Sequence, residues 1–360
     1  LTAVDTIETW ANQEHARLTG VFARRKREGR VRECHGDLHL RNIVYLDGEL
    51  RPFDCIEFNP DLRWIDVMNE VAFMVMDLYA ADRPDLARRF LNAYLESCGD
   101  YDGLRVLAYY VAYRAMVRAK INLMRVHQIE SASEGTGSLQ ERCGRYLDLA
   151  LSCTRQKPGF IAITRGFSGS GKTTLSQSLI ELSGAIRIRS DIERKRLQGM
   201  AANTHQETLI DTGIYAQDVT ESTYRHLLDL AHAILESGHG VIVDATFLQR
   251  RHRDWFSKLA AATRVPFAIL DFSAPEALLR ERIAARSRQG DDASDADLVV
   301  LEHQLRTAEP LQPEELAAVF AYDAARPVAD AQRPQSWAPL LRQLLSMPAS
   351  ACLSPASDQA

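Results

Sequence analysis

The stretch RGFSGSGKTTLSQSL, residues 165–179, decides the fold of the second half of this 360-residue chain. Gly166, Gly171, Lys172 and Thr173 occupy every fixed position of the pattern G-x-x-x-x-G-K-S/T, and the apolar run FIAITRGF leads into a helical spacing. Glycines let backbone N–H groups curl around phosphates, and the start of a helix adds partial positive charge. We therefore predict a phosphate-binding loop between a strand and a helix. Without that context, the stretch would be only a flexible Gly/Ser loop.

Nucleotide and metal contacts are expected from this loop. Lys172 would reach the β- and γ-phosphates, and the hydroxyl of Thr173 would bind Mg²⁺. ATP and Mg²⁺ are thus the predicted cofactors. The predicted nucleotide-binding residues are Gly166, Ser168, Gly169, Ser170, Gly171, Lys172, Thr173 and Thr174.

Short apolar strands alternate with helix-length segments in the rest of the second half. AIRIRS, GVIVDA and PFAILDF continue the series that FIAITRGF begins. This alternation predicts an α/β fold, in which helices flank both faces of a parallel sheet. Because Lys157-Pro158-Gly159 breaks the preceding helix, we place the second domain at residues 157–345. The small, polar residues 346–360 are predicted to be a disordered tail.

Two acidic residues follow strands of this predicted sheet. Asp191, in IRSDIERKRL, shares a helix face with Arg194 at the carboxyl edge of the sheet, where open α/β folds bind ligands. A carboxylate there can accept a proton from a substrate hydroxyl, and an arginine can hold the transferred phosphate. A capping box of Ser190 and Glu193 is the structural alternative. Asp244 ends the strand GVIVDA and would bind Mg²⁺, unless it only caps the next helix.

A helical hairpin is predicted from PEALLRERIAARSRQGDDASDADLVVLEHQ. Arg282 and Arg286 lie one turn apart on its first helix, and Ser294 is the expected N-cap of its second helix. Such a hairpin could close over the phosphates and supply an arginine to them. The alternative is a solvated, charged helix face.

The first half carries a different constellation, in HGDLHLRNIVYLDGELRPFDCIEFN, residues 35–59. Asp37 precedes Asn42 by five residues, and Asp54 follows a predicted hairpin whose turn is Asp47-Gly48. In one interpretation Asp37 orients and deprotonates a hydroxyl, while Asn42 and Asp54 bind Mg²⁺ on nucleotide phosphates. In the structural alternative, Asp37 caps a turn and Asp54 ends a strand.

Residues 159–330 resemble the P-loop small-molecule and polynucleotide kinases, a group that includes gluconate-kinase-like enzymes. The resemblance implies that Asp191 is the base toward the acceptor hydroxyl, with Arg194 beside it, and that Arg282 and Arg286 are lid arginines. With the loop, it favours an ATP-dependent small-molecule kinase or an ATPase as the function of this domain.

Residues 1–156 resemble the mostly helical C-terminal lobe of the aminoglycoside phosphotransferase family, which is related to the protein kinases. FDCIEFNPDLRWIDVMNEVAFMVMDL carries the metal-binding Asp54 and a later structural residue, Asp66, before a long helix; Glu57 would assist at the metal. The resemblance gives Asp37 the catalytic role. A chain that joins this lobe to a P-loop domain resembles bifunctional aminoglycoside phosphotransferase/ATP-binding proteins.

One part of that family pattern is missing from the first half. The 34 residues before His35 read as a charged helix closed by Gly29, with no strand pattern, no glycine-rich loop and no suitable lysine. A kinase-like fold needs those features in its N-terminal lobe. We therefore expect the first domain to be inactive alone in this chain, either as a fragment or because nucleotide binding has been lost.

The amino-acid composition indicates which class of protein the chain belongs to. An apolar content of 46%, a charged content of 25% and a net charge of −5 are those of a soluble globular protein without general attraction to nucleic acid. The six cysteines contain no CxxC pair and predict free thiols. No apolar run reaches the roughly 18 residues of a membrane span, and no secretory leader is recognisable. We expect a cytoplasmic protein with a small-molecule acceptor and no membrane partner.

Two other functions stay open at this point. A polynucleotide 5′-kinase would need a basic channel with stacking aromatic residues leading to Asp191. QRRHRDWF, with Arg250, Arg251, Arg253 and Trp255, is its candidate segment, although a charged helix that buries Trp255 is the more ordinary interpretation. In the second alternative, ATP binding to the loop gates a regulatory module that phosphorylates nothing.

Overall fold

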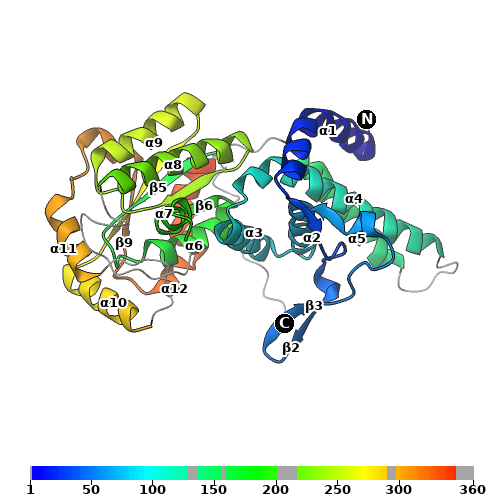
Figure 1. Ribbon diagram of the computed structural model, residues 1–360, viewed down its shortest axis with the longest axis horizontal. Helices are drawn as coiled ribbons and strands as arrows, with labels where there is room; N and C mark the ends of the chain where they lie inside the picture. Colours follow the sequence, from blue (N-terminus) through cyan, green and yellow to red (C-terminus); the bar gives the residue numbers. More distant parts are fainter. Residues whose placement is uncertain (1, 129–135, 156–158, 201–216, 290–296, 346–360) are drawn as a thin grey trace. The chain divides into compact units, whose positions relative to one another are not determined.

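The computed structural model contains two compact units, drawn in Figure 1. One is formed by Leu1–Tyr94 and Asp100–Gln156, and the other by Leu95–Gly99 and Lys157–Ala360. The structure describes residues 2–128, 136–155, 159–200, 217–289 and 297–345. The tail predicted to be disordered, residues 346–360, lies outside the described residues.

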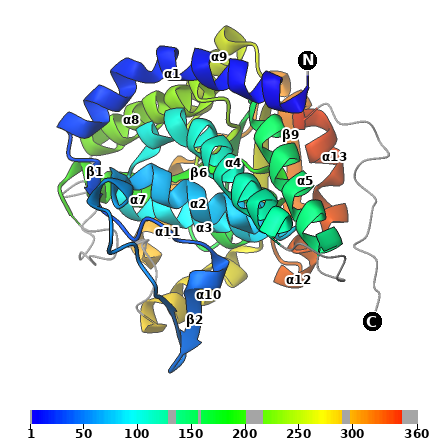
Figure 2. The same ribbon diagram turned by 90° about the vertical axis from the view of Figure 1, so that its right-hand side faces the viewer.

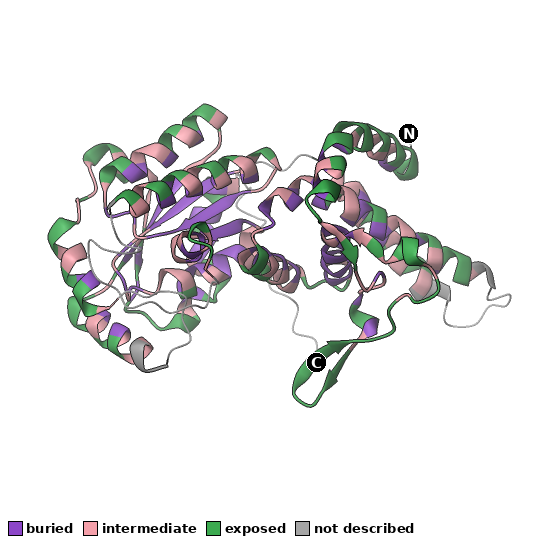
Figure 3. Cartoon of the chain, viewed as in Figure 1, coloured by how far each residue is buried: buried purple, intermediate pink, exposed green. Residues whose placement is uncertain are grey.

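A five-stranded parallel sheet forms the centre of the second unit, as the alternating pattern predicted. Its strand order is β6-β7-β5-β8-β9. The three inner strands are buried on both faces, which explains why their sequences are continuous apolar runs rather than alternating ones. Figure 3 shows this burial. The strands are β5 (Ile161–Arg165), β6 (Ile186–Arg189), β7 (Val241–Asp244), β8 (Phe267–Ser273) and β9 (Val319–Asp323).

Helices cover both faces of this sheet. On one face, α6 and α13 enclose an apolar core in which the Trp337 ring stacks on Tyr322 at 5.2 Å between centroids, and α12 packs against α6 and α13. On the other face, α8 packs on β6 and β7, and α9 packs on β5. The helices of this unit are α6 (Lys172–Ser183), α7 (Ser190–Leu197), α8 (Gln217–Glu236), α9 (Arg250–Thr263), α10 (Glu276–Gln289), α11 (Leu298–Thr307), α12 (Val328–Ala331) and α13 (Pro334–Leu345).

The order of the strands places the chemistry at one edge. The chain runs from the central strand β5 past β7 to β6, and returns through β7 before it crosses to β8. Because all strands are parallel, their carboxyl ends meet at the same edge of the sheet. Gly166, Ser190 and Ala245 are the first residues beyond β5, β6 and β7 at this edge, which is where open α/β sheets bind ligands.

The first unit is mostly helical. In Figure 2, which faces this unit, α2, α4 and α5 pack together. The predicted hairpin at Asp47-Gly48 is confirmed, and the charged N-terminal helix ends before Gly29, whose φ of 72° stops it. The elements are α1 (Ala3–Arg27), β1 (Val31–Glu33), η1 (Leu40–Asn42), β2 (Ile43–Leu46), β3 (Glu49–Pro52), η2 (Pro60–Leu62), β4 (Trp64–Asp66), α2 (Val67–Ala80), α3 (Pro84–Cys98), η3 (Tyr101–Gly103), α4 (Leu104–Gln128) and α5 (Thr136–Cys153).

A buried ion-pair network fastens α1 to the rest of the first unit. The guanidinium of Arg25, which is 1% exposed, donates to both oxygens of Asp66 at 2.7 and 2.8 Å and to both oxygens of Asp100 at 2.8 Å. Burial by itself would lower the pKa of Arg25, but these two carboxylates raise it instead. Asp66 also accepts from the N–H of Met68 and so caps α2. The aspartate that the sequence placed before a long helix therefore has a structural role.

The structure also bears on two expectations from composition, which concern membrane-spanning helices and the state of the cysteines. Within the described ranges, no helix has both the length and the apolar character needed to cross a bilayer. The five described cysteines are free thiols, as predicted, and Cys352 lies outside the described residues.

The Arg25 network makes a prediction about stability. Replacing Arg25 by Met should lower the free energy of unfolding of the first unit by about 3–5 kcal/mol, because it leaves two carboxylates buried without their partner. Urea unfolding followed by hydrogen exchange in peptides from α2 and α4 would report on this unit alone. Arg24→Met is the matched control: its pair with Asp102 is solvent-exposed, so a loss of less than about 1 kcal/mol is expected. Equal losses in the two variants would contradict the assigned role.

Candidate active site

The loop after β5 has the backbone that only glycines accommodate. Gly166 has a φ of 153°, and a Cβ there would lie 2.7 Å from the carbonyl oxygen of Phe272. Gly169 has a φ of 81°, and its Cβ would lie 2.8 Å from the carbonyl oxygen of Leu279. A side chain at either position would therefore distort the loop. The glycines of the sequence pattern serve this close packing as well as the access of a phosphate.

Lys172, the first residue of α6, lies half-buried beneath this loop. Its ammonium group donates to the carbonyl oxygens of Gly166 at 3.0 Å and of Phe167 at 2.9 Å. Burial lowers the pKa of Lys172 to about 8; Asp244 opposes this shift, and Arg286 adds to it. The lysine is thus held at the loop by weak neutral acceptors, which a charged phosphate oxygen would replace.

Thr173 and Asp244 meet at the ends of α6 and β7. The Thr173 hydroxyl donates to Oδ2 of Asp244 at 2.6 Å, and the hydroxyl of Thr164 donates to the Ala245 carbonyl beside them. A hydroxyl and a carboxylate are hard oxygen donors of the kind that Mg²⁺ prefers, and Mg²⁺ fills its other positions with water and phosphate oxygens. The described residues contain no cluster of three or more His, Cys, Asp or Glu that could hold a metal by itself. The pair therefore fits a magnesium ion that arrives with a nucleotide.

Asp191 lies at the start of α7 in a strong ion pair that the sequence analysis missed. Arg189, the last residue of β6, donates to Oδ2 of Asp191 at 2.8 Å, and the N–H of Ile192 donates to Oδ1. Burial would raise the pKa of Asp191, but Arg189 lowers it, so the carboxylate stays ionised. The position of Arg189, at the end of a buried strand and two residues before an acid, was the signal available for it.

The capping box that was the structural alternative at this helix is not formed. The N-cap of α7 is Arg189, which makes no side-chain cap, and Ser190 is already the first helical residue. Glu193 is buried and pairs with Arg196 and His226 instead. The helix begins one residue earlier than the capping pattern indicates because the strand passes into it without a turn.

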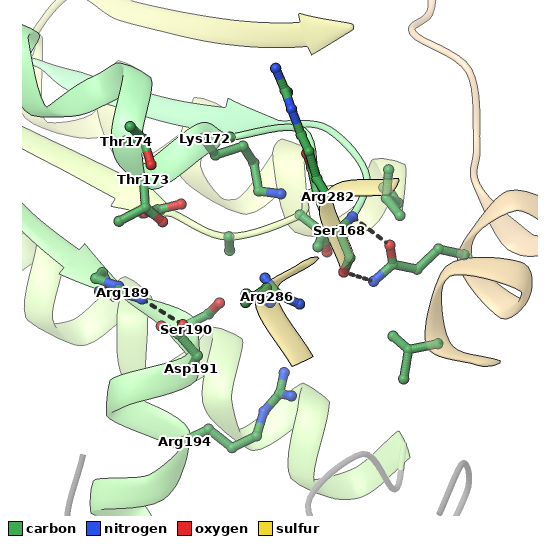
Figure 4. A pocket seen from close by; sticks show the side chains of 18 of the residues that line it. Ser168, Lys172, Thr173, Thr174, Arg189, Ser190, Asp191, Arg194, Arg282 and Arg286 are labelled. Carbon is green, nitrogen blue, oxygen red and sulfur yellow. Dashed lines mark hydrogen bonds and ion pairs between the residues drawn. The ribbon is translucent and has the colours of Figure 1, made fainter. Parts of the chain in front are cut away.

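The two predicted lid arginines on α10 have different surroundings. Arg282 donates to the carbonyl oxygen of Ala324 at 2.9 Å and contacts that of Gly169 at 3.5 Å, so it braces the loop from outside. Arg286 and Arg194, from α7, direct their guanidinium groups toward the space beside Asp191 (Figure 4). Arg286 is therefore better placed than Arg282 to contact a phosphate.

The second helix of the predicted hairpin makes an unforeseen contact with the loop. Gln304 of α11 accepts from the Ser168 N–H at 2.9 Å and donates to the Ser168 hydroxyl at 3.0 Å. The N-cap of α11 is Asp297, which accepts from the N–H of Val300. The predicted cap, Ser294, lies outside the described residues. No local pattern marks Gln304, because its partner is 136 residues away.

A cavity of about 470 Å³ joins these groups. Its wall toward α8 and β7 carries hydroxyl and amide groups from Thr220, Tyr224, Thr246 and Gln249. Positive groups outnumber negative ones, which suits a polyanion such as a nucleotide. The charged lining residues are Lys172, Arg189, Arg194, Arg282 and Arg286, against Asp191 and Asp244. Of the other predicted nucleotide-binding residues, Ser168, Gly169, Gly171, Thr173 and Thr174 also line it, while Ser170 is fully buried within the loop.

The first unit brings together only part of its predicted site. Asn42 donates to the backbone carbonyl of Asp37 at 3.1 Å and to its carboxylate at 3.3 Å. A hydrogen bond from His39 lowers the pKa of Asp37, with smaller contributions from Arg118 and Arg114. Asp54 lies on the exposed segment after β3 at a φ of 63°; in the described part of the chain, it has no hydrogen bond to Asp37 or Asn42. Glu57 is exposed as well.

The low pKa of Lys172 predicts a pH dependence of nucleotide binding. Below about pH 8 the free lysine is already an ammonium; above it, the lysine is neutral and must take up a proton to bind a phosphate. Calorimetry in buffers of different ionisation enthalpy should show almost no proton uptake near pH 7 and close to one proton per ATP near pH 9.5. Lys172→Arg, which keeps its charge throughout, is the control and should show no such change. Equal uptake in both proteins at high pH would contradict the assignment.

Comparisons with known proteins agree with the fold of the second unit. Residues 161–311 match the family model described as an AAA domain. Uncharacterized proteins of Mycobacterium bovis and Mycobacterium tuberculosis are 33% identical over 274 residues, which cover 76% of this chain and 54% of theirs. The chain therefore spans about half the length of the curated relatives it matches.

Similar solved structures were also found. They include a sugar kinase from Janibacter sp. (21% identity, 52% of this chain and 95% of that one, TM-score 0.40) and a gluconokinase from Sinorhizobium meliloti 1021 (25%, 53% and 95%, TM-score 0.37). The family match and the strand–loop–helix geometry indicate a P-loop NTPase domain in the second unit. The aminoglycoside phosphotransferase resemblance of the first half is not shown by these matches and stays a prediction.

Proposed function

We propose that the second unit transfers the γ-phosphoryl group of Mg-ATP to a hydroxyl group of a small molecule. The observation that carries this proposal is the presence, in one cavity, of a phosphate-binding loop and of a separate ionised carboxylate, Asp191, beyond the magnesium pair Thr173–Asp244. A nucleotide needs the loop and the magnesium pair. A second carboxylate, directed at the same space, is suited to an acceptor hydroxyl.

Each group has a role in this reaction that follows from its surroundings. The Lys172 ammonium would exchange its two carbonyl acceptors for β- and γ-phosphate oxygens, while Thr173 and Asp244 would hold Mg²⁺. Bound Mg²⁺ supplies neutralisation of the charge on the phosphates. Arg286 and Arg194 face the space where the transferred group would lie and would stabilise its equatorial oxygens.

Asp191 would act on the acceptor. Its pair with Arg189 keeps it ionised but also makes it a weak base. Phosphoryl transfer has a loose transition state, in which the hydroxyl loses its proton late, so orientation matters more than base strength. We therefore assign Asp191 to orienting the hydroxyl first and accepting its proton afterwards.

The lining of the cavity supports a polar acceptor. Thr220, Tyr224, Thr246 and Gln249 offer hydroxyl and amide groups on the wall formed by α8 and the segment after β7. The Tyr224 hydroxyl is already held by Thr246 and by the N–H of Phe247, and burial raises the pKa of this tyrosine. A substrate with several hydroxyl groups would find partners on this wall, whereas an apolar one would leave them unsatisfied.

For the first unit, we propose a kinase-like C-terminal lobe that has no phosphotransferase activity of its own in this chain. The contact between Asp37 and Asn42 and the position of Asp66 before α2 support the lobe. Asp54 is exposed and, among the described residues, has no hydrogen bond to Asp37 or Asn42, which supports the inactivity of the lobe. A bifunctional assignment would require Asn42 and Asp54 to converge on one metal beside Asp37.

The kinase proposal is tested by paired variants at the cavity. Lys172→Ala should lower ATP turnover at least about 100-fold. Asp191→Asn should keep the affinity for ATP, but its rate of phosphoryl transfer to the acceptor should fall about 10²–10⁴-fold. The measurement is ADP release and product mass across a panel of small polyhydroxy compounds. Asp229→Asn, at an exposed site of α8 outside the cavity, is the matched control and should resemble the wild type. ADP release that no acceptor accelerates and that Asp191→Asn leaves unchanged would replace the kinase by an ATPase or a nucleotide-gated module.

The polynucleotide alternative is weakened by the pairing of its arginines. Arg253 is 1% exposed and is bound by Glu315 at 2.6 and 3.0 Å. Arg250 pairs with Glu314 and Arg251 with Glu221. Trp255 is only half-buried, contrary to the expected burial. These carboxylates neutralise the segment that would have formed a basic channel.

We accordingly expect no retention of single-stranded oligonucleotides in a filter-binding assay, even at about 20 mM salt, where phosphate contacts are strongest. An Arg251→Gln variant should behave identically, because this arginine is already paired. Micromolar binding that weakens steeply with salt in the wild type and less steeply in Arg251→Gln would restore the polynucleotide kinase.

A further inference from the structure

A second cavity lies within the first unit, where the end of α2, the middle of α4 and α5 meet the HGDLHLR segment. It measures about 220 Å³, which is smaller than the roughly 300 Å³ at which sites for drug-sized ligands begin. Its polar lining comes from Arg41, Arg118, Asn122, Arg142, Arg145 and Tyr146, together with Asp77. The proposed function of the second unit makes no use of it.

The charges in this cavity are unbalanced. Four guanidinium groups face one carboxylate, that of Asp77. Both oxygens of Asp77 already have partners: the N–H of Leu40 donates to one at 2.9 Å and the Tyr146 hydroxyl to the other at 3.0 Å. Asp77 therefore fastens the loop and α5 to α2, and leaves most of the positive charge uncompensated.

Several other arginines of the unit, unlike those of the cavity, are paired with carboxylates. Arg24, Arg25 and Arg63 each have a carboxylate within 3.1 Å. In the part of the chain that the structure describes, none of the four cavity arginines has a carboxylate within 4.0 Å.

Among the cavity arginines, Arg118 shows most clearly the effect of having no carboxylate partner. Its side chain leans over the ring of Tyr146, with 6.0 Å from the guanidinium carbon to the ring centroid, and its buried Nε has no hydrogen-bond partner among the described residues. Buried donors without acceptors are uncommon, because losing water costs free energy that only a new partner restores. The missing partner is an acceptor, and the surrounding charges require it to be negative.

The cavity also adjoins the predicted catalytic segment. Arg41, on its rim, donates its backbone N–H to Nδ1 of His39 at 3.2 Å, and the other ring nitrogen of His39 lies 3.4 Å from the Asp37 carboxylate. Arg118 is among the charges that lower the pKa of Asp37. The positive field of the cavity thus extends to this carboxylate.

We propose that this cavity binds a small, soluble, phosphate-bearing molecule. Guanidinium groups present planar pairs of N–H donors that match the oxygens of a phosphate, and four of them suit a group with more than one negative charge. The ligand class is the opposite of an aminoglycoside, which is a polycation. The anion would lie between the ends of α2 and the HGDLHLR segment and the helices α4 and α5, with Arg118 and Arg142 as its main partners.

The test uses the full chain carrying Lys172→Ala, so that the phosphate-binding loop of the second unit contributes as little as possible to the binding that is measured. Inorganic pyrophosphate in a metal-free buffer is the probe, and calorimetry measures its affinity. Hydrogen exchange of the α5 peptide 139–153 localises the site. We expect protection of this peptide, and an affinity that falls about ten-fold or more in Arg142→Gln.

The matched control is Arg27→Gln, which removes the same charge from an exposed site on α1 outside the cavity. It should keep the parental affinity. Arg118→Gln is expected to show the larger loss, and Arg145→Gln, at an exposed position, gives a second measurement should Arg118→Gln not fold. Equal affinities in Arg142→Gln, Arg145→Gln and Arg27→Gln, or absence of protection in the α5 peptide, would overturn the proposal. So would tighter binding of kanamycin than of pyrophosphate.

Discussion

The candidate active site depends on one constraint, the partial burial of the Lys172 side chain under its own loop. A buried cation needs acceptors, and the loop supplies them by turning the carbonyl groups of Gly166 and Phe167 inward. That turn requires the positive φ values of the glycines. The same burial makes the lysine ready to exchange two neutral acceptors for charged ones. The shape of the loop and the low pKa of Lys172 thus have a single cause.

Charge is distributed in the second unit so that binding and chemistry remain separate. Asp191 is neutralised by Arg189 and Asp244 is bound to Thr173, so neither carboxylate repels an incoming nucleotide strongly. The net positive charge comes from residues on α7 and α10, Arg194 and Arg286, which do not belong to the loop. In the proposed reaction, cations on separate helices would allow the field on the transferred group to change if those helices move.

The parts of the structure that local patterns describe could be predicted. The loop, the apolar strands and the position of Asp244 all follow from spacing within about twenty residues, because strand, turn and helix are set by neighbouring residues. Gln304 and Arg189 could not be found in the same way, since their roles come from contacts made only after folding. The capping box at Ser190 failed for a related reason: the strand enters α7 directly, and tertiary packing decided where the helix begins.

The first unit shows how a motif and its surroundings can indicate different ligands. Asp37 and Asn42 lie in contact, as the motif predicts. This geometry indicates how a hydroxyl or a metal would be held, but it does not indicate which ligand binds. The ligand class depends on the charges nearby, and these come from helices that lie about a hundred residues further along the chain, at Arg118 and Arg142. The family that the motif resembles is named after aminoglycosides, which are polycations, but a resemblance of motif and fold does not determine the substrate. The cavity beside the motif, with four guanidinium groups and one carboxylate already in use, favours an anion, and electrostatics rather than motif identity should decide between them.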